Sequence, residues 1–218
     1  ASTTIGATGA VLKAVNVTAT SADTTSSTAT LSGDIFATTV TAVATSATNN
    51  DTIAFGDKVT ATTLNLDGAG AFSFADTATA AIVISGDSTS TVAADQIIVG
   101  AVTNDGTTGE GTLTFAATTE DTTLASTTIG ATGAVLKAVN VTSTANTATL
   151  AGNVFATTVT ATATDTTGSD KVAFNGTVNA GTLALVGTGS FSFDDIVTTT
   201  SDLDIVAGAK IVLTDGIV

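Results

Sequence analysis

The chain has 218 residues and a net charge of −14, from 19 Asp and Glu against only 5 basic residues, all of them lysines. This balance argues against nucleic acid as a partner, because a phosphate backbone is met by lysine and arginine side chains. The sequence contains no Cys and no His, which excludes zinc, haem and iron–sulfur sites built on them, and Ser–His–Asp or Cys–His catalytic groups. We therefore predict that the protein is not an enzyme, and we assign no catalytic, cofactor-binding or metal-binding residue.

The first eighteen residues, ASTTIGATGAVLKAVNVT, return unchanged at 125–142. Three later pairs of segments also match: 28–42 with 147–161, 53–55 with 172–174, and 63–74 with 182–193. The polar stretch 19–27 is five residues longer than its counterpart 143–146, which predicts a surface loop there. We interpret 1–124 as a first repeat of about 120 residues and 125–218 as a second, truncated repeat, joined in one continuous rod.

Within each repeat the local pattern predicts β-strands, because apolar residues alternate and so share one face of an extended chain. The alternating pairs, in chain order, are Val15 and Val17, Leu64 and Leu66, Phe72 and Phe74, and Leu113 and Phe115. Pairs of Gly with Asp or Asn separate these stretches and predict sharp turns. No segment is predicted to be a helix.

Two all-β architectures fit short strands separated by turns. Asp-Gly and Asn-Gly pairs are hairpin signals, which favour tandem immunoglobulin-like β-sandwiches. Small residues, the scarcity of large aromatic anchors (nine Phe and no Trp or Tyr) and the lack of a linker between the copies favour a β-solenoid, which we predict. Coils of roughly 20 residues would give about eleven rungs and a rod near 50 Å long.

The segments GTLTF, TIGATGAVLKAVNVT and TATLAGNVFATT resemble the Thr/Ala/Gly/Val-rich repeats in the passenger regions of large bacterial surface proteins. These are the rickettsial outer-membrane surface antigens and related autotransporter adhesins, and the resemblance covers most of both copies. It implies a secreted β-solenoid displayed on the cell surface. The overall composition is also similar to that of surface-layer proteins.

Three acidic clusters are candidates for calcium, a hard cation that takes several oxygen ligands. They are Asp194 with Asp195, Asp202 with Asp204, and Asn49-Asn50-Asp51. The sequence has no EF-hand loop and no glycine-rich nonapeptide. We therefore favour solvated turn residues over a calcium site.

Two lysines, Lys13 and Lys137, occupy the same position in the repeated phrase. Each could form an ion pair with a neighbouring rung, or face solvent and blunt a strand edge. We favour the solvent-facing interpretation for both.

The expected function is that of a non-catalytic, extracellular structural rod, a segment of a bacterial cell-surface adhesin or filament. A homo-oligomer or fibre formed through end-to-end or lateral contacts is expected, with cell-surface or matrix components as further partners. No membrane insertion is expected, because the sequence has no run of about 18 apolar residues. The alternatives are a calcium-stiffened immunoglobulin-like adhesin repeat and a surface-layer lattice subunit.

Overall fold

The computed structural model describes residues 4–21, 25–48, 50–164 and 169–214. Within these residues the chain forms strands and no helix, so none has the length and apolar character needed to cross a membrane. Every ladder between the named strands is parallel. The fold is a β-solenoid, as predicted, and the immunoglobulin-like alternative is wrong because its sheets would be antiparallel.

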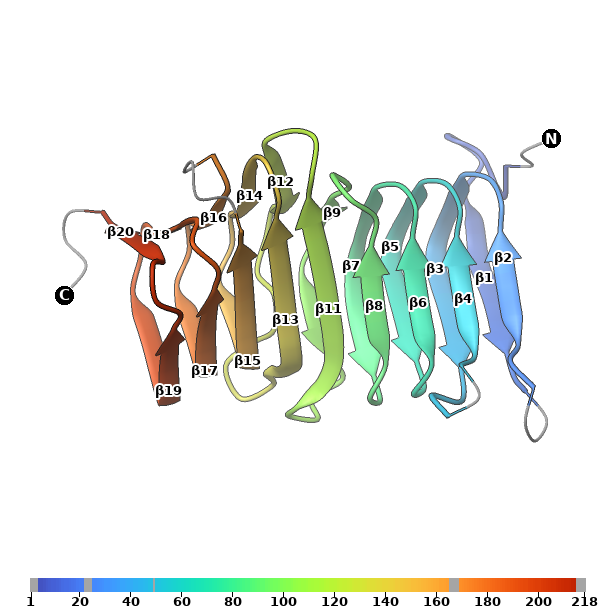
Figure 1. Ribbon diagram of the computed structural model, residues 1–218. Helices are drawn as coiled ribbons and strands as arrows, with labels where there is room; N and C mark the ends of the chain where they lie inside the picture. The colour runs from blue at the N-terminus through green and yellow to red at the C-terminus, as the bar shows by residue number, and fades with distance from the viewer. Residues whose placement is uncertain (1–3, 22–24, 49, 165–168, 215–218) are drawn as a thin grey trace.

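Two sheets face each other along the rod (Figure 1). The eleven-stranded sheet contains, in spatial order, β1 (Leu12–Ala19), β3 (Ile35–Ala44), β5 (Val59–Asp67), β7 (Ala78–Ser85), β9 (Ile98–Val99), β12 (Thr122–Ala125), β14 (Thr147–Leu150), β16 (Lys171–Phe174), β18 (Ser190–Phe193) and β20 (Lys210–Leu213), with β10 (Val102–Asn104) paired to β7. The nine-stranded sheet contains β2 (Thr28–Leu31), β4 (Thr52–Phe55), β6 (Ala71–Phe74), β8 (Thr89–Val92), β11 (Glu110–Ala117), β13 (Leu136–Ser143), β15 (Val154–Ala163), β17 (Val178–Val186) and β19 (Val197–Ile205).

The core consists of columns of apolar side chains stacked from coil to coil. Val40, for example, pairs with Val15 on one side and with Leu64 on the other. In the short strands the phenylalanines stack face to face: the ring centroids of Phe55 and Phe74 lie 5.0 Å apart. Because parallel, in-register strands place residue over residue, the period-two pattern of each strand produces a continuous apolar interior.

Glycine is required at corners where neighbouring coils approach each other. Gly68 has a φ of +103°, and a Cβ atom there would lie 2.2 Å from the carbonyl oxygen of Ala44 in the preceding coil. Gly187, its counterpart in the second copy, has a φ of +99° and the same 2.2 Å approach to the carbonyl of Ala163. Only glycine tolerates both the conformation and the contact.

Coil length varies, and it varies where the sequence comparison places an insertion. Val15 pairs with Val40, 25 residues further on, whereas the equivalent Val139 pairs with Val159 after only 20 residues. The five-residue difference is therefore accommodated in one turn between strands, as predicted, although residues 22–24 of that turn lie outside the described residues.

Most coils are longer than the 20 residues assumed from sequence, so the rod has fewer rungs than expected. Val40 and Leu64, for instance, are one coil and 24 residues apart. The ordered path of the longer sheet has ten strands, which at about 4.8 Å per step gives about 43 Å between the outermost strands.

The two copies of the repeat are related by a half-turn about the rod axis. The long strands β1, β3, β5 and β7 of the first copy lie in the eleven-stranded sheet, whereas their counterparts β13, β15, β17 and β19 lie in the nine-stranded sheet (Figure 1). The exchange occurs at a seam where the short strand β8 pairs with the long strand β11. One repeat therefore contains a half-integral number of coils.

An ion pair spans this seam. The Nζ atom of Lys137 lies 2.7 Å from Oδ2 and 2.9 Å from Oδ1 of Asp87, in the turn between β7 and β8. The solvent-facing interpretation is thus wrong for Lys137, which pairs with the first copy because β11 places β13 within reach of that turn. Lys13 is exposed on β1 and has no ion pair among the described residues.

Candidate functional site

The two ends of the solenoid are the places where the apolar core meets solvent. Each outermost strand pairs with a neighbour on one side only, so its inward-facing side chains lack the covering coil that the interior strands have. Its free edge also presents backbone N–H and C=O groups that can extend a sheet. The end formed by β19 and β20 is called the C-terminal end surface here, and the end formed by β1 and β2 the N-terminal end surface.

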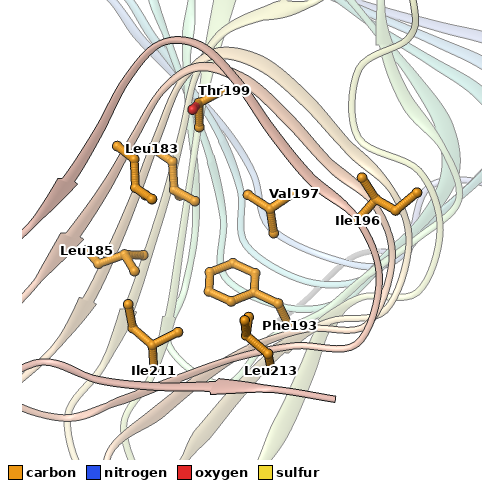
Figure 2. Close-up of a pocket in the computed structure, with 9 residues that line it drawn as sticks. Leu183, Leu185, Phe193, Ile196, Val197, Thr199, Ile211 and Leu213 are labelled. Atoms are coloured by element: carbon orange, nitrogen blue, oxygen red, sulfur yellow. The ribbon is translucent and has the colours of Figure 1, made fainter. Parts of the chain in front are cut away.

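The C-terminal end surface is a hollow of about 350 Å³. It is lined by Leu183, Leu185, Phe193, Ile196, Val197, Thr199, Leu203, Ile211 and Leu213. Figure 2 shows the ring of Phe193 inside the ring of aliphatic side chains, with Leu185 and Ile211 on one side and Val197 above it. The hollow is therefore the solenoid core itself, open at its last coil.

A comparison with the first copy shows how much burial one more coil provides. Ile205 and Ile84 stack on the equivalent residues Leu185 and Leu66. Ile84 is 0% exposed and Ile205 is 41% exposed. The difference is that β7 has further strands stacked on it and β19 has none.

The N-terminal end surface gives the same result with identical sequence. Val139 and Val141 on β13 are fully buried, because β11 covers them. Val15 and Val17 on β1 are the same residues in the same phrase, yet they are only partly buried. Exposure at this end is thus set by the absence of a covering strand and not by the local sequence.

The outer faces of the two end strands carry opposite charges. Asp202 and Asp204 are exposed on β19, and Lys13 is exposed on β1. Charged side chains on an edge strand disfavour indiscriminate pairing and leave complementary pairing open.

The acidic clusters lie apart from any metal site in the described residues. Asp194 accepts a hydrogen bond from the Thr214 hydroxyl at 2.7 Å, and Asp195 accepts one from the Thr177 hydroxyl at 3.0 Å. No group of three or more acidic side chains placed to hold a metal ion occurs in the part of the chain that the structure describes. Asn49 lies outside that part.

Asp51 is a buried structural acid between coils. Its carboxylate accepts hydrogen bonds from the backbone N–H groups of Ser21, Ser27 and Ser46 at 3.1–3.3 Å, and from the Thr45 hydroxyl at 2.9 Å. Burial raises the pKa of Asp51, but these hydrogen bonds outweigh it, so the pKa lies below its ordinary value. The acidic side chains thus join neighbouring coils.

Asp95 joins coils in the same way. It accepts hydrogen bonds from the backbone and hydroxyl groups of Thr118 and Thr119, at 2.6–3.1 Å. Burial raises the pKa of Asp95, and the hydrogen bonds from Thr119 and Thr118 outweigh this and lower it.

We expect the melting temperature to fall on acidification because of these two carboxylates. A pKa that is lower in the folded state than in the unfolded state, where it is about 3.9, stabilises the fold above that value. This stabilisation is lost as the pH falls through the folded-state pKa. Melting curves between pH 7 and pH 2 test this.

The matched variant is Asp51→Asn, with Asp202→Asn as the control for removing one charge. Asp51→Asn should lower the melting temperature at pH 7, and its difference from the natural chain should shrink toward pH 2. Comparison at each pH cancels the general effect of protonating the other carboxyl groups. A difference that stays constant down to pH 2 would contradict the prediction.

Sequence analysis does not single out the residues of the end surfaces. Alternation assigns Leu203 and Ile205 to the inner face, but no local signal distinguishes them from covered residues such as Leu183. A signal is available from the repeat: β19 and β20 are the counterparts of β7 and β8, and the stretch that covers β7 and β8 in the first copy has no counterpart among the described residues.

No protein-family model, curated protein or solved structure matches the chain. Its function is therefore inferred from the geometry of the rod and of its two end surfaces.

Proposed function

We propose that the protein is a non-catalytic structural rod of the bacterial cell surface, a segment of an adhesin or filament that extends by end-to-end stacking. The observation that carries this proposal is the pair of apolar end surfaces. At the C-terminal end Leu203, Ile211 and Leu213 are 38–56% exposed, although they continue columns that are fully buried one or two coils away. Exposed apolar surface of this kind marks an interaction site.

The extracellular placement has support from composition and resemblance. The chain has no Cys and no Met, so it contains no sulfur that oxidation could damage. The repeated phrase resembles surface-exposed passenger regions. A rod of stacked coils suits display, because each added coil extends its reach without a new core design.

We expect the purified 218-residue chain to form longer particles of constant width as its concentration rises. Contacts between unlike ends do not close, so the products should be linear and open-ended. Sedimentation velocity over a concentration series measures the association, and electron microscopy measures particle length and width. A chain that stays monomeric throughout, or that forms two-dimensional sheets as a surface-layer subunit would, contradicts this proposal.

A further inference from the structure

We propose that a second copy of this chain docks on the C-terminal end surface through its own N-terminal end surface, rotated by a half-turn about the rod axis. In this arrangement β1 of the second copy pairs with β19, and β2 of the second copy pairs with β20. The inference rests on the proposed end-to-end assembly and specifies its geometry.

The winding of the chain selects the half-turn. β1 precedes β2 by half a coil, and β19 precedes β20 by half a coil. A strand stacked on β19 must likewise precede the strand stacked on β20, so β1 follows β19 and β2 follows β20. Because β1 lies in the eleven-stranded sheet and β19 in the nine-stranded sheet, the second copy must turn by half a revolution.

Without that rotation the sheets do not continue. β1 would stack on β20, and the nine-stranded sheet would lack one strand at the junction. Strand lengths favour the same arrangement: β1 has 8 residues and β19 has 9, whereas β2 and β20 have 4 each. The chain already contains this half-turn between its two copies.

The columns inside the rod fix the register of docking. Leu203 continues the column of Val139, Val159 and Leu183, and Val15 is the counterpart of Val139. Val15 of the second copy therefore lies opposite Leu203.

The same reasoning extends along both strands. It places Val17 of the second copy opposite Ile205, and Leu31 of the second copy opposite Leu213. Each apolar column continues into the second copy, and each exposed end residue gains the covering side chain that its interior counterpart has.

Charge favours unlike ends over like ends. In this register Ala14 of the second copy lies opposite Asp202, so the neighbouring Lys13 of the second copy comes beside the Asp202 carboxylate. Cross-strand pairs of opposite charge stabilise a sheet, and like charges destabilise it. Contacts between two C-terminal end surfaces would bring Asp202 and Asp204 against their own copies, so the rods are directed head to tail.

Disulfide trapping tests the register, because the chain has no cysteine of its own. On the outer faces Asn16 of the second copy lies opposite Asp204, about 4.8 Å away between Cα atoms, which a disulfide can span. Chains carrying Asn16→Cys and chains carrying Asp204→Cys are mixed under mild oxidation. A covalent dimer is expected from the mixture, and neither chain alone should give it.

Two further mixtures serve as controls. Thr18→Cys with Asp204→Cys is two residues out of register, at about 8 Å, beyond the reach of a disulfide. Asn16→Cys with Val212→Cys reports the unrotated arrangement, because Val212 lies on β20. All four positions are exposed, so the substitutions leave the core intact.

A charge exchange provides a second, independent readout by sedimentation. Lys13→Glu should weaken association by about two- to fivefold, and adding Asp202→Lys to the same chain should restore it.

The outcomes separate the inference from the proposed function. Association without the Asn16–Asp204 disulfide, or trapping of either control pair in its place, overturns the half-turn geometry and leaves end-to-end assembly standing. A chain that never associates overturns both.

Discussion

Replacing Ile84 with lysine is expected to prevent the first copy from folding, whereas replacing Ile205 with lysine should leave the fold intact and abolish end-to-end assembly. The two residues are counterparts, each stacked on the equivalent leucine of the preceding coil. Ile84 is fully buried, so Ile84→Lys would place an unpaired charge in the core at a cost of several kcal/mol. That is comparable with the whole stability of a typical domain.

At Ile205 the lysine ammonium group can reach water, because the side chain is on the open end of the rod. Circular dichroism melts should therefore show a lost or strongly lowered transition for Ile84→Lys and a nearly unchanged transition for Ile205→Lys. Sedimentation should show that Ile205→Lys no longer associates. Equal effects of the two substitutions on melting would mean that the C-terminal end surface is covered within the single chain.

The strands were predictable because their signal is local. Val15, Val17, Leu64 and Leu66 lie on the inner face as their alternation predicts, since the period of two belongs to any extended chain. The loop between matching segments was also predictable, because a five-residue insertion in a polar stretch is absorbed at a corner and changes only the length of one coil.

The half-turn between copies was not predictable from the repeat. It depends on how many coils one repeat contains, which in turn depends on each coil length. Those lengths are set by corners such as Gly68, where the neighbouring carbonyl of Ala44 leaves no room for a side chain. The ion pair between Lys137 and Asp87 was hidden for the same reason, because it joins residues 50 positions apart across the seam.

The end surfaces are a property of position along the rod. Val15 and Val139 occupy identical phrases, and only the presence of β11 distinguishes their burial. A linear reading assigns both to the core, which is correct for the face and silent about the neighbour. A solenoid therefore requires the coil order before its interaction sites can be located.

Phe174→Ala is expected to lower the free energy of unfolding by about 3–5 kcal/mol, the usual cost of removing a buried aromatic side chain. The Phe174 ring is 1% exposed and stacks on Phe193, with ring centroids 5.2 Å apart and planes inclined by 3°. Urea unfolding monitored by circular dichroism measures the change. Because each coil rests on the next, the loss should also appear as faster amide exchange in β16 and β18.

Two matched variants determine whether the stacked column is the cause. Phe55→Ala removes the equivalent ring in the first copy, which is paired with Phe74, and should cost a similar amount. Phe155→Ala removes a ring that is only partly buried, and should cost about 1 kcal/mol, roughly half the burial contribution of a full side chain. If Phe155→Ala destabilised the protein as much as Phe174→Ala, the stability of the rod would not reside in its stacked interior. The continuation of that interior across the two end surfaces would then lose its physical basis.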